Sequence, residues 1–431
     1  MTATTDVVVR TPRSEAWARR RSRRSVVRRG AIVFASTLAW HASNFLFNGV
    51  TARLLGPARY GDLAATLALL YVVSPLLVSV QTVMSAAATE LAVRGRIGEI
   101  RSLLRAQRIR VVIAVTCVAG VTAAASPIVA RFLRLDSPLP LVVIGIGLGL
   151  SITTHWQRGV LQGTSAFGRY AVSTLVEAST KIAAAVVMVV FISSTTTGAA
   201  AAVPVSATFG LLVNVHLLRF LPRTETQKYE LPRASAQTPA TAATFILLAV
   251  LLAADVVAAK RFLPAEAAGL YASVSLAGKV VYFATSALSL LLFPVFTEQR
   301  ARKVSEARPL LVGGAMIAGA SAVLSAAYFA APRLIVHVLF GAGYRGAASY
   351  LGWIALAFGS YALVYLFATY LLAHRARIGV ALLGTAVAAQ VSALAVFHGS
   401  VGAIVGVQVV VLGIAALALA VAAGRVGRRM A

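Results

Sequence analysis

Long apolar runs recur along the whole chain, and short polar segments that hold most of the charged residues separate them. Each run has about 20 residues, the length at which an α-helix crosses about 30 Å of hydrocarbon. The runs are continuously apolar, without the two-residue alternation of a membrane β-barrel. The pattern predicts an all-α integral membrane protein with about twelve spans. We expect these spans at 31–50, 63–84, 111–129, 139–154, 170–192, 198–218, 241–257, 267–295, 310–330, 350–372, 379–397 and 401–423.

The composition agrees with this pattern. Of the 431 residues, 59% are hydrophobic and only 12% are charged, whereas soluble proteins have about 25% charged residues. This excludes most soluble functions.

The positive charges between the spans are sorted to alternate sides of the membrane. Of the 40 Lys and Arg residues, 30 lie on the side of the N-terminus, 8 lie on the other side, and two lie within apolar runs. Because cytoplasmic loops carry the excess of Lys and Arg, both termini are predicted to be cytoplasmic. The net charge of +27 then reflects topology, and we expect no nucleic acid partner. We expect the basic N-terminal tail to be disordered and to lie near anionic membrane lipids.

The longest internal connection is polar and contains proline, as a linker does, and it separates six spans from six. The expected organisation is a basic cytoplasmic tail (1–29), an N-terminal half (30–221), a cytoplasmic linker (222–240), a C-terminal half (241–424) and a second basic tail (425–431).

The two halves resemble each other in sequence. Segments 52–61 and 259–269 follow the first spans of their halves, and both combine basic residues, a proline and a closing glycine. When Gly61 and Gly269 are aligned, a glutamate follows 29 residues later in each half. Each half has an even number of spans, so the repeats run parallel and are related by an axis along the membrane normal. Transporters built in this way place the substrate path between the repeats.

Four ionisable residues lie within the apolar runs, where such a group costs about 2.5–3.5 kcal/mol on insertion scales and usually faces a cavity or a partner. Glu177 and Lys181 are one turn apart in the fifth span, and they form either a neutralised pair or a polar patch on a cavity wall. Lys279, in the eighth span, has no acid within helical reach, and we expect it to face a cavity. Asp255 lies in the seventh span, and three roles stay open for it. It pairs with Lys279 on the next span, it serves as a proton or cation site, or it caps Lys260 and Arg261 at the end of its own span.

A neutral polar stripe lies on the first span. His41, Asn44 and Asn48 occur at i, i+3 and i+7, so they share one helix face. Asn48 and Asp255 lie at equivalent positions of the repeat. The stripe forms interhelical hydrogen bonds or lines the cavity. Two lysines, Lys181 and Lys279, lie near the middle of their spans. A cavity lined by these lysines suits an anionic substrate.

Several loop sequences resemble those of a known family. Leu55-Gly56-Pro57-Ala58-Arg59-Tyr60-Gly61, Arg158-Gly159-Val160-Leu161-Gln162-Gly163 and Leu339-Phe340-Gly341-Ala342-Gly343-Tyr344 are similar, in this order, to motifs of polysaccharide-export (Wzx-type) flippases. These belong to the multidrug/oligosaccharidyl-lipid/polysaccharide (MOP) exporter superfamily. The resemblance implies a V-shaped pair of six-helix bundles that moves polyprenyl-diphosphate sugars to the outer leaflet.

Our hypothesis is therefore a flippase of the bacterial cytoplasmic membrane for envelope polysaccharide biosynthesis. Lys279 and Lys181 hold the phosphates, and Asn44 and Asn48 bind sugar hydroxyls. Asp255 or Glu177 couples a proton or sodium gradient. The partners are then the lipid-linked sugar and glycosyltransferases or a polymerase of the same pathway.

Three alternatives stay open. A drug/cation antiporter of the same superfamily would use Asp255 to bind a cation. A membrane glycosyltransferase or polymerase would need catalytic acids in an outer loop, where Asp62 and Asp136 are isolated. A scaffold would bind a partner and transport nothing. We expect no enzyme activity, cofactor or metal, and the chain contains no GxxxxGK[ST] nucleotide motif.

Overall fold

The structure, a computed structural model, describes residues 12–221, 239–301 and 307–430. Within these ranges every regular element is a helix, and eleven helices are long and apolar enough to cross a membrane. The first of them contains two of the expected spans, so the count agrees with the prediction of about twelve.

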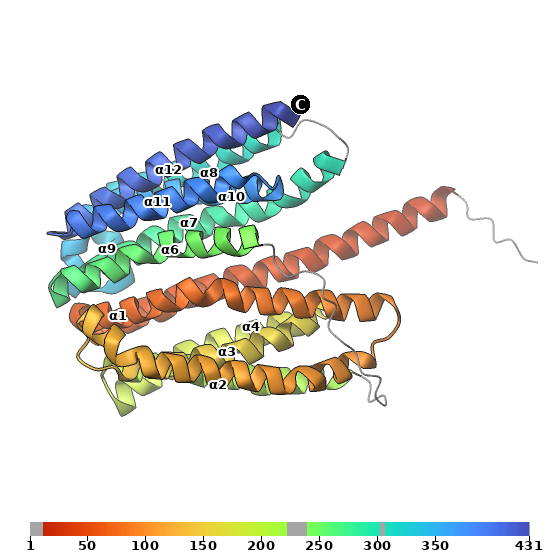
Figure 1. Cartoon of the computed structure of the whole chain (residues 1–431), viewed down its shortest axis with the longest axis horizontal. Helices are drawn as coiled ribbons and strands as arrows, with labels where there is room; N and C mark the ends of the chain where they lie inside the picture. Colours follow the sequence, from red (N-terminus) through yellow and green to blue (C-terminus); the bar gives the residue numbers. More distant parts are fainter. Residues whose placement is uncertain (1–11, 222–238, 302–306, 431) are drawn as a thin grey trace, which may run out of the picture.

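The first helix, α1 (Pro12–Val93), reverses direction in its middle (Figure 1). Gly56 there has φ 72° and ψ 172°, a conformation open to glycine and strained for other residues. Pro57 follows as the first residue of the returning helix, where its missing N–H costs nothing. The helix begins at Pro12, so the part of the basic tail from that residue onwards is helical, and the expectation of a disordered tail is wrong there.

Four more helices complete the N-terminal bundle: α2 (Glu99–Leu133), α3 (Leu139–Gly163), α4 (Phe167–Val187) with the π-helical turn η1 (Met188–Ile192), and α5 (Thr196–Leu217) with the 3₁₀ turn η2 (Leu218–Phe220). The C-terminal bundle contains α6 (Pro239–Phe262), α7 (Ala265–Ala301), α8 (Ala307–Ala330), α9 (Pro332–Phe340), the 3₁₀ segment η3 (Ala342–Tyr350), α10 (Leu351–Ala373), α11 (Arg377–Val396) and α12 (Val401–Met430).

Helix α3 is longer than the predicted span, which ended at residue 154. Its last turns pack against the returning part of α1 through two glycines spaced as in GxxxG motifs. A Cβ atom on Gly159 would lie 2.5 Å from the carbonyl oxygen of Gln81, and one on Gly163 would lie 2.3 Å from that of Ser85. The glycines therefore allow the two backbones to touch.

Helix α9 was expected to be part of a loop. It begins with Pro332 at its first position, buries Val336 and Phe340, and exposes Leu334 and Val338. Nine residues are too few to span the membrane. A short helix with one buried and one exposed face is typical of a helix that lies at a membrane surface.

The two bundles form a V (Figure 1). They meet at the end that carries α9 and the reversal of α1, and they diverge towards the end that carries the C-terminus. One hydrophobic core joins both bundles, and it includes Phe47 and Tyr60 from one and Tyr271 and Phe340 from the other. The exact boundaries of the halves stay a prediction, because residues 222–238 of the linker lie outside the described residues.

Candidate functional site

A buried charged cluster lies between helices α3 and α4 of the N-terminal bundle. Arg158 of α3 and Glu177 of α4 form an ion pair of 2.7 Å, and only 4% and 5% of their side chains are exposed. The Arg158 guanidinium also donates from Nε to the Ser173 hydroxyl (2.8 Å) and from Nη2 to the Ser173 carbonyl (2.9 Å). Helix α5 approaches closely because Gly210 has no side chain: a Cβ atom there would lie 2.8 Å from Glu177 Oε2.

Lys181 lies next to this ion pair and is also buried. Its ammonium donates to Asn44 Oδ1 on α1 and lies 4.8 Å from the Trp40 ring and 5.3 Å from the Phe47 ring. The cluster thus contains two cations and one carboxylate, and Arg158 is the residue that directly pairs with the carboxylate.

This differs from the pair of Glu177 with Lys181 considered above. The sequence prediction placed Arg158 in a loop, because the apolar run ends before it. A signal that was missed is the spacing of Gly159 and Gly163, four residues apart after Arg158, which is typical of close packing between membrane helices.

A second buried cluster lies in the C-terminal bundle. Asp255 of α6 accepts hydrogen bonds at Oδ2 from the Tyr271 hydroxyl (2.9 Å) and the Ser275 hydroxyl (2.6 Å) of α7. Lys279 Nζ lies 3.9 Å from Asp255 Oδ1. The alternative in which Asp255 serves Lys279 is therefore confirmed.

The alternative in which Asp255 caps the cations at the end of its own span is wrong for Lys260. That lysine pairs with Asp62 of α1, and both side chains are buried. Asp62, which looked isolated in the sequence, therefore has a partner in the other bundle.

The polar stripe of α1 divides among three environments. Asn44 accepts from Lys181, whereas Asn48 donates to the Asn44 carbonyl (2.8 Å) and accepts from the Tyr60 hydroxyl (3.4 Å). His41 stacks on Phe283 of α7, with 4.4 Å between the ring centres. The stripe therefore links the N-terminal cluster to the surface where α1 meets the other bundle.

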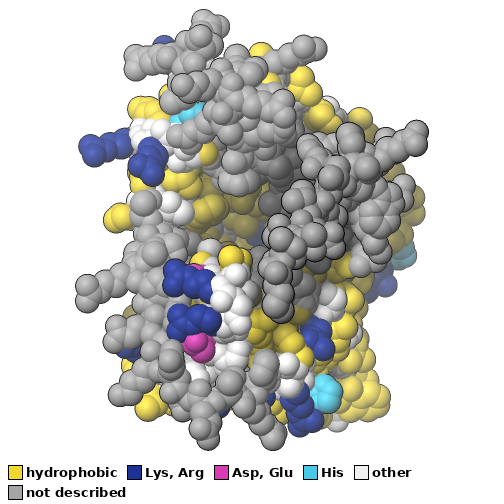
Figure 2. Space-filling view, turned by 90° about the vertical axis from the view of Figure 1, so that its right-hand side faces the viewer, with side chains coloured by type: hydrophobic (Ala, Val, Ile, Leu, Met, Phe, Trp, Pro, Cys, Tyr) yellow, Lys and Arg dark blue, Asp and Glu magenta, His cyan; other side chains and the backbone are white. Residues whose placement is uncertain are grey.

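At the end of the molecule that carries the C-terminus, Lys and Arg side chains are spread over the described surface (Figure 2). Among the described residues, no three His, Cys, Asp or Glu side chains come together in a group that could hold a metal ion.

No protein-family model matches the chain, and no curated protein matches it in sequence. Solved structures do match it. An inward-facing multidrug resistance MATE family transporter of the MOP superfamily superposes with a TM-score of 0.72 at 12% identity, over 90% of this chain and 94% of that one. This is the MATE fold.

The chain also superposes on a MATE transporter in the outward-facing state. An outward-facing MATE transporter superposes with a TM-score of 0.62 at 14% identity, over 93% of this chain and 96% of that one. A MOP superfamily transporter from Pyrococcus furiosus, for which reverse polarity of the binding pocket suggests a different function, gives 0.57 at 13% identity, over 93% and 96%. This chain is thus more similar to the inward-facing than to the outward-facing MATE structure.

Proposed function

We propose that this protein is a membrane transporter that works by alternating access, and that it moves a lipid-linked oligosaccharide from the inner to the outer leaflet. The V-shaped pair of bundles and the likeness to MATE transporters in inward-facing and outward-facing states support the transport cycle. The substrate is argued from the charges inside the bundles.

The observation that carries the substrate class is the excess positive charge of the N-terminal cluster. Arg158 pairs with Glu177, and the hydrogen-bond acceptor for Lys181 is the neutral amide of Asn44. A lysine in a membrane interior is costly and marks a substrate or ion path. A diphosphate would offer Lys181 an anionic partner, which the lysine binds as a compact point charge.

The other candidate residues take roles around this anion site. Lys279 is the second candidate phosphate ligand, and a phosphate would compete for it with Asp255, which lies 3.9 Å away. Asn44 and Asn48 are the candidates for binding sugar hydroxyls. Asp255 and Glu177 are the candidates for coupling to a proton or sodium gradient, and each carboxylate pairs with a cation in this structure, Asp255 with Lys279 and Glu177 with Arg158.

The test is lipid flipping in proteoliposomes that contain a polyprenyl-diphosphate sugar, read out by a lectin that reaches one leaflet. We expect Lys181→Ala and Lys279→Ala to lower the flipping rate at least about tenfold, equivalent to about 1.4 kcal/mol. The control is Arg377→Ala, which removes an exposed cation at the start of α11 and should leave the rate unchanged.

An unchanged rate for Lys279→Ala would remove that lysine from the site. A wild-type protein that flips no lipid-linked sugar would contradict the proposed substrate.

A second candidate is a drug/cation antiporter, which the multidrug MATE structures and the buried Asp255 carboxylate favour. It predicts that vesicles export a cationic dye and that Asp255→Asn stops the export. Sugar incorporation by the purified protein would instead indicate a glycosyltransferase, and partner binding without any flux would indicate a scaffold.

A further inference from the structure

The two bundles touch through residues that are equivalent in the sequence repeat. A Cβ atom on Gly61 would lie 3.0 Å from the Gly269 nitrogen, and a Cβ atom on Gly269 would lie 1.8 Å from the Pro57 carbonyl oxygen. In a two-fold symmetric contact, residues close to the axis meet their own counterparts. The pseudo-two-fold axis between the bundles therefore passes near these glycines, at the end of the molecule opposite the C-terminus.

Beside the glycine contact, a buried ion pair crosses between the bundles. Lys260 of α6 pairs with Asp62 of α1, and only 6% and 9% of these side chains are exposed. Both charges therefore lose most of their water when the bundles meet.

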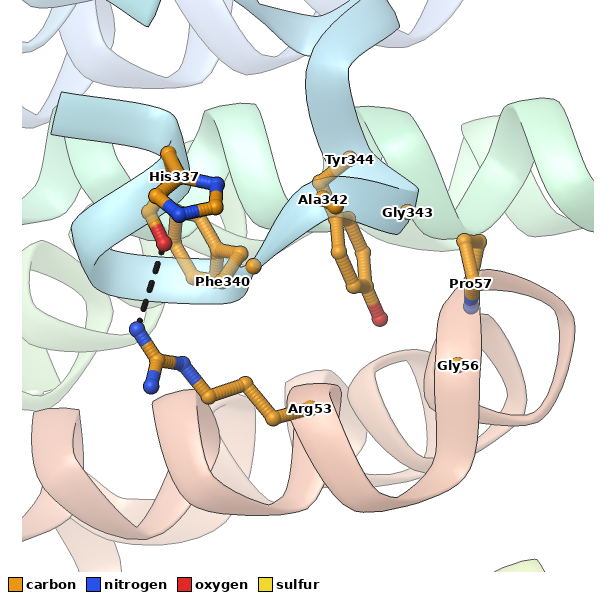
Figure 3. Close-up of a pocket in the computed structure, with 9 residues that line it drawn as sticks. Arg53, Gly56, Pro57, His337, Phe340, Ala342, Gly343 and Tyr344 are labelled. Carbon is orange, nitrogen blue, oxygen red and sulfur yellow. Dashed lines mark hydrogen bonds between the residues drawn. The ribbon is translucent and has the colours of Figure 1, made fainter. Parts of the chain in front are cut away.

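The residue that matches Lys260 in the other half is Arg53, since each lies four positions before the proline of its segment. Arg53 also crosses the seam, the contact surface between the two bundles: its Nη2 donates to the His337 carbonyl oxygen (3.2 Å) in the last turn of α9 (Figure 3). It donates to the Val338 carbonyl oxygen as well. The His337 carbonyl also accepts from the Gly341 N–H (3.0 Å), and a cation is favourable at the C-terminal end of a helix, where the helix dipole is negative.

Segment η3 covers the seam from the C-terminal bundle. The Tyr344 hydroxyl donates to the Ala52 carbonyl (2.9 Å), and its ring packs edge-on against Tyr60. A cavity of about 360 Å³ lies between η3, the end of α9 and the reversal of α1 (Figure 3). Because of this cavity, segment η3 has space to move relative to α1.

We propose that these contacts form the outer gate of the transporter, with Asp62 and Lys260 as its latch and Gly61 and Gly269 as the contact that allows it to close. The inference rests on the proposed transport cycle. The gate is closed in this structure, which is more similar to the inward-facing than to the outward-facing MATE transporter.

The chemistry of the latch suits a contact that must open repeatedly. A buried ion pair gains Coulomb energy but loses hydration, and the two terms nearly cancel. When the bundles separate, water hydrates both charges, and this hydration offsets the lost Coulomb attraction between them. The latch itself therefore adds little to the free-energy difference between the closed and open states, so both states can be populated.

The test measures conformation directly, by electron-electron distances between spin labels in lipid nanodiscs. In a Cys117→Ser background, spin labels on Ser137→Cys and Gly399→Cys measure the distance between the bundles at the outer end. Labels on Gly98→Cys and Ala373→Cys measure this distance at the other end. These sites lie in connections or helix ends on opposite bundles. Gly269→Ala should lengthen the outer distance and shorten the other, because its new Cβ atom meets backbone at the closed seam.

The latch variants should act in the same direction but less strongly. Asp62→Asn and Lys260→Met each raise the outward-open population several-fold, and the exchange Asp62→Lys with Lys260→Asp restores the wild-type distances. The control is Gly319→Ala in α8, where an added Cβ atom meets nothing within 4 Å and no distance should change.

A second experiment holds the seam closed with a cleavable thiol cross-linker between Asp62→Cys and Lys260→Cys, and its readout is the flipping rate. Flipping should stop on cross-linking and resume after reduction. Flipping that persists with the seam cross-linked, or distances that stay unchanged in Gly269→Ala, would overturn the gate. If the distances shift as expected while the wild type flips no sugar lipid, the gate stands and the proposed substrate fails.

Discussion

At the scale of single residues, Arg158 shows how a charge is retained inside the membrane. Its guanidinium makes three polar contacts, two with Ser173 and one with Glu177, and planar Arg is suited to such multiple pairing. Burying one charge without the other is far more costly than burying the pair.

We therefore predict that Arg158→Met destabilises the protein by about 3–5 kcal/mol, because Glu177 is left buried and unpaired. Adding Glu177→Gln should recover part of this loss. Thermal unfolding of the detergent-purified variants measures the effect.

The control pair is Arg96 and Glu99, which are more exposed. Breaking it with Glu99→Gln should cost less than about 1 kcal/mol. Equal losses for Arg158→Met and Glu99→Gln would contradict a structural role for the buried pair.

The sequence identified Glu177, Lys181, Asp255 and Lys279 because ionisable groups stand out in apolar runs. It identified their partners less well. Asp255 was placed with Lys279 only as one alternative, and Glu177 was considered with the lysine on its own helix. Partners on other helices depend on helix rotation and tilt, which local spacing does not specify.

At the scale of elements, two glycines let α3 pack closely on α1, beside large apolar side chains such as Met84 and Trp156. Membrane helices associate in this way because lipid is as apolar as a leucine side chain, so close backbone approach provides the attraction. The same glycines hold Arg158 at a depth where it reaches Glu177.

We predict that Gly163→Ala costs about 1–3 kcal/mol, the usual range for overpacking, because the new methyl group would overlap the Ser85 carbonyl. The matched control is Gly168→Ala in α4, where an added Cβ atom meets nothing within 4 Å. If both variants unfold at the same temperature as the wild type, the close contact of α3 with α1 is not formed.

At the scale of the whole molecule, the distribution of Lys and Arg predicts which end faces the cytoplasm. In a Cys117→Ser background, we expect a membrane-impermeant thiol reagent added to whole cells to label Gly399→Cys but not Ala373→Cys. Gly399 follows α11 and Ala373 ends α10, so one helix separates the two sites.

In inside-out vesicles the labelling should reverse. Labelling of Ala373→Cys in whole cells would contradict cytoplasmic termini and would reverse the direction of the proposed gate.

The sequence by itself determined the helices, their approximate number, the parallel repeat and the buried charges, because a bilayer imposes a fixed span length and a high cost on each charge. Only the tertiary structure decided that Arg158 pairs with Glu177, that Lys260 reaches Asp62 in the other bundle, and that Gly61 meets Gly269. These contacts join helices far apart in the chain, and they depend on how the two bundles lean together, which no local pattern encodes.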